Sequence, residues 1–221
     1  MTRKKYELTS ETVVHFGKTL YRIKALIDFS WVKAGEAGGF VEAGKNLDQD
    51  GDAWVSGDAR VSGDAWVYGD AWVYGDAWVS GDARVYGDAR VYGDARVSGD
   101  ARVYGDARVY GDARVSGDAW VYGDARVYGD ARVYGDARVY GDADFFMVSS
   151  VGSSNGTLIV TRDKDGELLV TRGCFIGSLD AFAAAVEKTH GDNLHGQTYR
   201  ALIEVIRLRF AAPVKDTAEA A

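Results

Sequence analysis

GDARVYGDARVYGDARVS, residues 81–98, contains the strongest structural signal of the chain. It belongs to a tract in which the six-residue pattern Gly-Asp-Ala-(Arg/Trp)-Val-(Ser/Tyr) runs fifteen times without an insertion, from Gly51 to Tyr140. A sixteenth copy begins at Gly141 and breaks after Ala143. Repetition at a fixed short period is typical of a solenoid, in which each copy buries its apolar side by stacking on its neighbours.

Each six-residue copy predicts a short strand followed by a corner. Ala83 and Val85 stand two residues apart with Arg84 between them. A period of two sends the alanine and the valine to one side of a strand and the arginine to the other. The following Tyr86-Gly87-Asp88 must then turn the chain, because glycine takes positive φ freely and aspartate tolerates it better than most residues.

A second, longer period indicates how many copies make one coil. The residue after valine is serine at 62, 80, 98 and 116, whereas the copies between these carry tyrosine at 68, 74, 86, 92, 104, 110, 122 and 128. Serine therefore returns every eighteen residues, which predicts three hexapeptides per coil and one edge that differs from the other two. Fifteen copies give five coils, a rod roughly 24 Å long at the strand spacing of ~4.8 Å.

The flanks of the repeat predict end domains. We expect an N-terminal β cap over residues 1–39, a β-helix over 40–144 with regular repeats at 51–140, a C-terminal α+β domain over 145–211, and a flexible tail over 212–221. Val41, Ala43 and Leu47 are expected to keep the phase of Ala53 and Val55, so that an irregular coil begins near Phe40.

The C-terminal domain should contain three strands and two helices. We expect strands at 145–151, 157–162 and 167–172, and helices at 179–190 and 198–210. Ser178 is the expected N-cap of the first helix, and Gly191 follows its end.

Composition limits the choice of partner and compartment. The net charge is −7, and residues 51–146 hold 17 Asp against 10 Arg, so nucleic acid is an unlikely ligand for the repeats. The single cysteine, Cys174, excludes an internal disulfide. We find no leader-like segment and no apolar stretch long enough to span a membrane, which favours the cytoplasm of a bacterial host cell, or association with a phage.

The repeat resembles the hexapeptide motif of left-handed parallel β-helix proteins. In that family an aliphatic residue and a small residue four positions later point inward, and Val85 and Ala89 match these roles. The resemblance implies a mainly β fold with a left-handed coil. Many relatives are acyltransferases that use a histidine beside a coil, whereas the histidines here, His15, His190 and His195, all lie in the flanks.

A second resemblance covers most of the chain. The segments 4–8, 17–25, 38–42, 173–177 and 190–192 are similar to phage- and prophage-encoded hexapeptide-repeat proteins of uncharacterised function. This resemblance implies a phage or prophage origin.

The repeats carry no catalytic histidine, and we expect a non-enzymatic scaffold without a cofactor or a metal ion. One alternative is a small enzyme in the C-terminal domain, built from Cys174, His190 and His195 and displayed on the rod. Another alternative is a phage protein that inhibits the host by mimicking nucleic acid with its acidic repeats. A calcium site is disfavoured, because one carboxylate per corner is sparse for a cation that takes six to eight oxygens.

Arginine and tryptophan point outward from the strands, where they offer an interaction surface. Its candidate residues are Trp54, Trp66, Trp72, Trp78, Arg84, Arg90, Arg96, Arg102, Arg108, Arg114 and Trp120. The less bulky edge is a candidate oligomer face, made of Ser62, Ser80, Ser98 and Ser116. We expect a protein partner or self-association as a homo-oligomer, for which a side-by-side trimer is one arrangement. The competing interpretation is a solvated surface on which aspartates simply offset the arginines.

Overall fold

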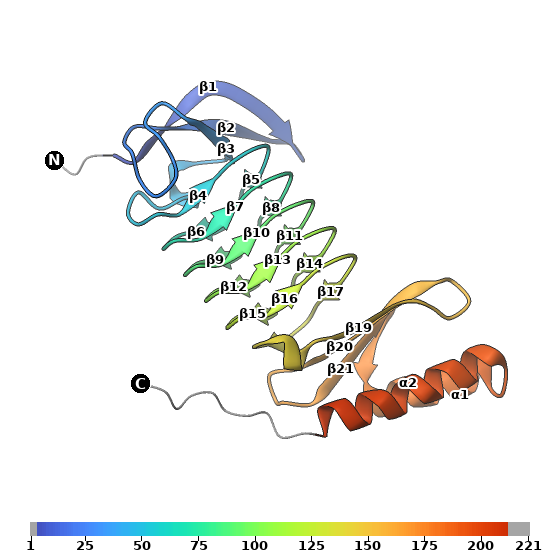
Figure 1. Ribbon diagram of the computed structural model, residues 1–221. Helices are drawn as coiled ribbons and strands as arrows, with labels where there is room; N and C mark the ends of the chain where they lie inside the picture. Colours follow the sequence, from blue (N-terminus) through green and yellow to red (C-terminus); the bar gives the residue numbers. More distant parts are fainter. Residues whose placement is uncertain (1–3, 212–221) are drawn as a thin grey trace, which may run out of the picture.

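The computed structural model describes residues 4–211 and is mainly a β-solenoid of about six turns with a small C-terminal helical part. An N-terminal cap covers one end of the solenoid, and an antiparallel sheet with two helices covers the other (Figure 1). The tail predicted at 212–221 lies outside the described residues.

The N-terminal cap is a small sheet that continues into the solenoid. Strands β1 (Tyr6–His15) and β2 (Lys18–Ala25) form an antiparallel hairpin, and β3 (Ala37–Val41) pairs antiparallel with β2. On its other edge β3 pairs in parallel with the first repeat of its sheet, where Val41 lies opposite Val61. The coil therefore begins near Phe40, as predicted.

Each repeat contributes a strand of two residues, Arg or Trp followed by Val. These strands are β4 (Trp54–Val55), β5 (Arg60–Val61), β6 (Trp66–Val67), β7 (Trp72–Val73), β8 (Trp78–Val79), β9 (Arg84–Val85), β10 (Arg90–Val91), β11 (Arg96–Val97), β12 (Arg102–Val103), β13 (Arg108–Val109), β14 (Arg114–Val115), β15 (Trp120–Val121), β16 (Arg126–Val127), β17 (Arg132–Val133) and β18 (Arg138–Val139).

The fifteen strands are distributed over three parallel sheets, each named here by its first repeat strand. The β4 sheet holds β4, β7, β10, β13 and β16, the β5 sheet holds β5, β8, β11, β14 and β17, and the β6 sheet holds β6, β9, β12, β15 and β18. In register, Arg90 lies between Trp72 and Arg108, eighteen residues away on each side. Equivalent residues therefore form straight columns along the rod.

The interior is filled by alanine and valine, whose side chains are fully buried in every repeat. The corners depend on glycine: Gly99 has φ +68°, and a Cβ placed on it would lie 3.0 Å from the backbone nitrogen of Gly117 in the next coil. Backbone hydrogen bonds join successive coils, for example from Arg96 N to Ala113 O at 2.9 Å. The repeat is thus selected for a narrow interior and for close stacking of corners.

The first coil departs from the predicted phase. Val41 lies opposite Val61 and Leu47 opposite Val67, so both occupy the valine position, and the prediction that they keep the phase of Ala53 is wrong. The physical reason is a two-residue insertion before the regular repeats. This longer segment includes Gln49, whose Oε1 accepts a hydrogen bond from Lys5 N at 2.8 Å and so ties β1 to the coil.

Lys5 closes the exposed backbone at the N-terminal end of the β4 sheet. Its side chain is 1% exposed, and its Nζ donates to the carbonyl oxygens of Asp50, Gly51 and Ala53 at 3.0–3.1 Å. In the next coil the equivalent carbonyl of Ala71 accepts from Trp54 N. The first coil has no preceding coil whose backbone amides could donate to these carbonyl oxygens. The ammonium group of Lys5 donates to them instead.

The C-terminal domain extends the β6 sheet. After a 3₁₀ turn (Asp142–Asp144), strands β19 (Phe146–Val151), β20 (Gly156–Arg162), β21 (Leu168–Arg172) and β22 (Phe175–Ser178) pair antiparallel, and β20 also pairs with β18. Helices α1 (Leu179–His190) and α2 (Leu194–Phe210) pack on this sheet around a second buried core.

The helices match the sequence in part. The bounds of α1 and its N-cap are confirmed, since Ser178 Oγ accepts from Ala181 N. Helix α2 begins four residues earlier than predicted, because Asn193 caps it and accepts from Gly196 N. Strand β22 was not predicted. Within residues 4–211, neither helix is long and apolar enough to cross a membrane.

Candidate interaction surface

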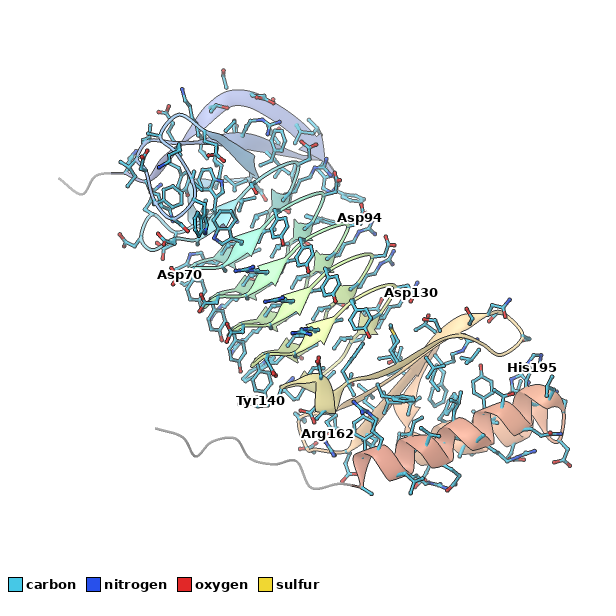
Figure 2. The ribbon with its side chains drawn as sticks, viewed as in Figure 1. Asp70, Asp94, Asp130, Tyr140, Arg162 and His195 are labelled. Atoms are coloured by element: carbon cyan, nitrogen blue, oxygen red, sulfur yellow. The ribbon has the colours of Figure 1, made fainter. Side chains whose placement is uncertain are left out.

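The outward side chains of the three sheets form three columns of arginine and tryptophan. The β4 sheet presents Trp72, Arg90, Arg108 and Arg126, the β5 sheet presents Arg60, Trp78, Arg96, Arg114 and Arg132, and the β6 sheet presents Trp66, Arg84, Arg102, Trp120 and Arg138. Aspartates line the edges between the sheets, with Asp94 and Asp130 on one edge and Asp70 on another (Figure 2).

Trp54 is a correction to the predicted surface. Its side chain points outward from the first strand of the β4 sheet, yet it is 0% exposed. Tyr6 and Phe29 of the cap pack against it edge-on, with ring centroids 6.4 and 5.3 Å away. Trp54 therefore anchors the cap to the solenoid and offers no surface to a partner.

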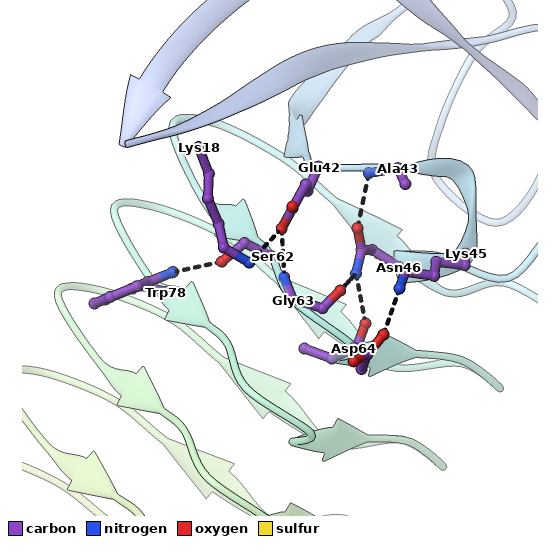
Figure 3. Close-up of polar contacts among 10 residues, drawn as sticks. Lys18, Glu42, Ala43, Lys45, Asn46, Ser62, Gly63, Asp64 and Trp78 are labelled. Carbon is purple, nitrogen blue, oxygen red and sulfur yellow. Dashed lines mark hydrogen bonds and ion pairs between the residues drawn. The ribbon is translucent and has the colours of Figure 1, made fainter. Parts of the chain in front are cut away.

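Ser62 is a second correction, because it lies beneath the cap and is 4% exposed. Its Oγ accepts a hydrogen bond from Trp78 Nε1 at 3.3 Å (Figure 3). Next to it, Gly63 N donates to Glu42 at 2.6 Å and Gly63 O accepts from Asn46 Nδ2 at 3.0 Å. As no earlier repeat covers this corner, side chains of the cap supply the missing partners.

The tip of the β1–β2 hairpin covers Trp78. Phe16 stacks on the indole with ring centroids 5.0 Å apart, and His15 meets its edge at 4.8 Å. Burial and the charges of Arg60 and Arg96 lower the pKa of His15. No local pattern indicates this contact, since the hairpin lies about sixty residues before Trp78.

Below this tip the serine edge is open and forms a groove of about 250 Å³. We call it the serine groove; it is lined by Trp78, Ser80, Arg96, Ser98, Arg114, Ser116 and Tyr134. Two predicted sets, the arginine surface and the serine face, therefore meet in one place. Arg96 and Arg114 are exposed there.

The arginines of the repeats lack carboxylate partners. Among residues 4–211, none of the ten lies within 4.0 Å of an aspartate or glutamate oxygen. Three repeat aspartates form ion pairs, Asp58, Asp64 and Asp136. Their partners, Arg22, Lys45 and Lys164, all lie outside the regular repeats. Charge compensation between the arginines and aspartates of the repeats therefore acts over distances longer than a direct ion pair.

Arg102 and Arg138 are engaged in another way. Their guanidinium carbons lie 4.7 and 4.4 Å from the ring centroid of Trp120. Such cation–π contacts orient both side chains along the β6 sheet. The arginines of the β5 sheet below Trp78 have no comparable aromatic partner among the described residues.

Tyrosines form stacks along the two other edges. Tyr68, Tyr86, Tyr104 and Tyr122 stack with centroids 4.8–5.0 Å apart, and Tyr74, Tyr92, Tyr110 and Tyr128 stack at 4.8–5.6 Å. Burial in the stack, reinforced by Tyr86 and Tyr122, raises the pKa of Tyr104 to about 12. Stacked rings thus fill most of the length of these two edges, whereas small serine side chains leave the third edge recessed.

In the C-terminal domain the candidate catalytic residues are only partly brought together. His190 and His195 lie with ring centroids 5.7 Å apart, and Cys174 is exposed on the turn between β21 and β22. A cavity of about 270 Å³ is lined by His190 with Arg172 and Tyr199, but not by Cys174 or His195. Arg172 Nε donates to Tyr199 Oη at 3.0 Å, which fixes the wall of this cavity.

A metal site has no obvious place in the described part of the chain. No group of three or more histidine, cysteine, aspartate or glutamate side chains is placed there to hold an ion. The aspartate columns keep one carboxylate per corner, as the repeat dictates.

Comparison with known proteins supports the architecture. A family model described as YdcK Beta solenoid repeat matches residues 53–69, 83–98, 95–109, 107–123, 119–133 and 131–143. All these matches fall within the repeats, so the end domains are not covered. A search of curated proteins gives no match. The chain is thus similar, through its repeats, to a β-solenoid family.

Proposed function

We propose that this protein is a non-enzymatic β-solenoid scaffold of phage or prophage origin, whose solenoid offers a protein-binding surface for self-association. We further propose a left-handed β-helix with three hexapeptides per coil. The pairing of residues eighteen apart and the resemblance of the repeat to hexapeptide proteins support this geometry. The bacterial cytoplasm or the phage particle would be its location.

The observation that carries the proposal is the column of unpaired arginines beside the serine groove. Arg96, Arg114 and Arg132 are exposed, and their strands stack at the ~4.8 Å spacing of a β-sheet. Like charges at this distance repel, so an opposed column of carboxylates would be stabilising.

A second copy of the chain meets this requirement. Its aspartate columns have the same spacing, because both columns follow the rise of the same coil. Asp82, Asp100 and Asp118 stand two residues after the serines of the recessed edge and are exposed. Two rods lying side by side could therefore match arginine to aspartate at every coil, and the small serines would allow close approach.

Charge reversal tests this proposal. We expect Arg96→Glu/Arg114→Glu and Asp100→Lys/Asp118→Lys each to weaken self-association at least about tenfold, since each places like charges opposite one another. An equimolar mixture of the two variants should associate again, because each reversed column then faces its complement. Sedimentation velocity measures all three samples.

The matched control reverses arginines of another sheet. Arg90→Glu/Arg108→Glu changes the net charge equally but lies on the β4 sheet, so association should persist. Monomeric wild-type protein, or equal loss in the control, would refute the serine groove as the contact. Reproducible catalytic turnover that is lost with Cys174→Ala would refute a non-enzymatic role.

A further inference from the structure

A cavity of about 510 Å³ lies where the N-terminal cap overhangs the first coils of the β4 sheet. Trp31 of the cap, Trp72 of the sheet and Tyr74 of the adjoining edge line it, and Asp52, Asp70 and Asp88 line its opposite edge. Asp70 lies on the flank of the solenoid close to the cap (Figure 2). The volume is within the range of small-molecule and peptide side-chain sites.

The cap fixes the backbone turn that carries Trp31 beside this cavity. Phe29 and Val32 exchange two backbone hydrogen bonds, at 2.8 and 3.1 Å, around the two-residue turn Ser30-Trp31. Val32 is buried and Phe29 packs on Trp54, so both ends of the turn are fixed. The Trp31 side chain is nevertheless 86% exposed.

Trp72, which lines the same cavity as Trp31, occupies a position where the following coils of the same column carry arginine. Arg90, Arg108 and Arg126 succeed it along the β4 sheet. Tyr74 beside it is held by stacking on Tyr92 at 4.8 Å. Tryptophan in this column is therefore confined to the part beneath the cap, while the tyrosine stack continues along the rod.

The polar lining is mainly negative. Asp52, Asp70 and Asp88 occupy equivalent corners of successive coils, and Asp70 also accepts a hydrogen bond from Asp52 N at 3.1 Å. Among residues 4–211, none of the three forms an ion pair. Arg90 is the basic residue at the lower boundary of the cavity, so carboxylates outnumber it.

We propose that this cavity binds an alkylammonium or guanidinium group, as carried by a polyamine or by a lysine or arginine side chain. Aromatic faces attract a cation and cover its alkyl body, while carboxylates bind its N–H groups. The site lies on the β4 sheet, away from the serine groove of the β5 sheet, and does not depend on self-association.

Isothermal titration calorimetry of the full chain at low salt tests the site with three probes: spermidine, an end-blocked Gly-Lys-Gly peptide, and the same peptide with its lysine acetylated. We expect saturable binding of a cationic probe and at least about tenfold weaker binding of the acetylated peptide, which lacks the charge. Spermidine alone would indicate a free polyamine as the ligand, and the lysine peptide would indicate a protein side chain.

Substitutions locate the binding. Trp31→Ala should weaken it about tenfold without affecting folding, since this side chain is exposed. Asp88→Asn should weaken it several-fold, whereas Asp106→Asn, one coil further along the same edge, should change it less than about twofold. Far-ultraviolet circular dichroism checks that each variant is folded.

Three results would overturn the proposal: no saturable binding of either cation, equal binding of the acetylated peptide, or equal losses in Asp88→Asn and Asp106→Asn. The Arg96→Glu/Arg114→Glu variant separates this site from the proposed function. It should lose self-association and still bind the cationic probe.

Discussion

At the scale of single residues, the cap depends on side chains that imitate backbone. Lys5 and Asn46 donate to carbonyl oxygens that would otherwise face a missing coil. Both are almost fully buried, and burial lowers the pKa of Lys5 to about 8. Burying a charged amine is unfavourable unless its protons are used, and here three carbonyls use them.

Replacing Lys5 with methionine should therefore lower the free energy of unfolding by about 3 kcal/mol, because it leaves buried carbonyl oxygens without donors. Urea denaturation followed by circular dichroism measures the loss. Lys4→Met is the matched control: Lys4 is exposed, and we expect a change within about 0.5 kcal/mol. Equal effects of the two substitutions would contradict the capping role.

At the scale of elements, the periodicity of the sequence predicts the strands and the helix whose patterns are local. The strands of the repeats and helix α1 follow local patterns that need no distant partner to be recognised. The burial of Trp54 and Ser62, the phase of Val41 and the covering of Trp78 could not be predicted this way. The phase of Val41 results from the two-residue insertion before the regular repeats. The other three depend on cap residues that meet the solenoid across a long stretch of chain, as Lys5 meets Ala53.

The sequence predicts the arginine and tryptophan surface and the serine face as two separate sets of residues. Only the structure shows that they meet in the serine groove. The eighteen-residue period placed Ser80, Ser98 and Ser116 on one edge, yet nothing local showed that Arg96 and Arg114 lie unpaired beside them. Trp31 was not predicted at all, because its exposure results from a turn whose flanking residues are buried by the cap.

The tyrosine stacks make stability sensitive to alkali. Burial raises the pKa of Tyr104 to about 12, so the neutral phenol is favoured in the folded protein. This contribution is complete below about pH 10, the unfolded pKa, and is lost as the pH rises through about 12. Lys5 has the opposite effect on stability, since its lowered pKa makes the folded protein more stable as the pH rises from about 8 to 10.5. The test is therefore made above this interval.

We expect the melting temperature to fall steeply across this alkaline interval. The Tyr104→Phe variant keeps a ring in the stack but removes its ionisation, so its melting temperature should fall less. Tyrosinate absorbance recorded in the same titration should rise later than for free tyrosine. A melting temperature that is constant up to pH 12 would contradict the burial of these rings.

At the scale of the whole molecule, the rod behaves as a stack in which each coil contacts only its neighbours. Stability is then close to a sum of coil and interface contributions, with the two end domains protecting the exposed backbone. The antiparallel sheet at the C-terminal end continues the β6 sheet, and the cap at the N-terminal end continues the β5 sheet (Figure 1).

Removal of residues 87–104 should accordingly leave a folded protein, because one complete coil is lost and all columns are rejoined in register. Small-angle X-ray scattering should show a maximum dimension smaller by ~4.8 Å. Removal of residues 87–89 should instead abolish cooperative unfolding, since a shift of three residues places tyrosine and aspartate at the inward positions and arginine at the glycine corners. Similar behaviour of the two deletions would contradict a coil of eighteen residues.

If a second copy of the chain neutralises the unpaired arginines of the serine groove, the wild-type protein is an oligomer at low salt. Sedimentation equilibrium measures its mass. We expect a multiple of 23.9 kDa that falls toward the single-chain value as salt screens the charges. A mass of 23.9 kDa at every protein and salt concentration would contradict it.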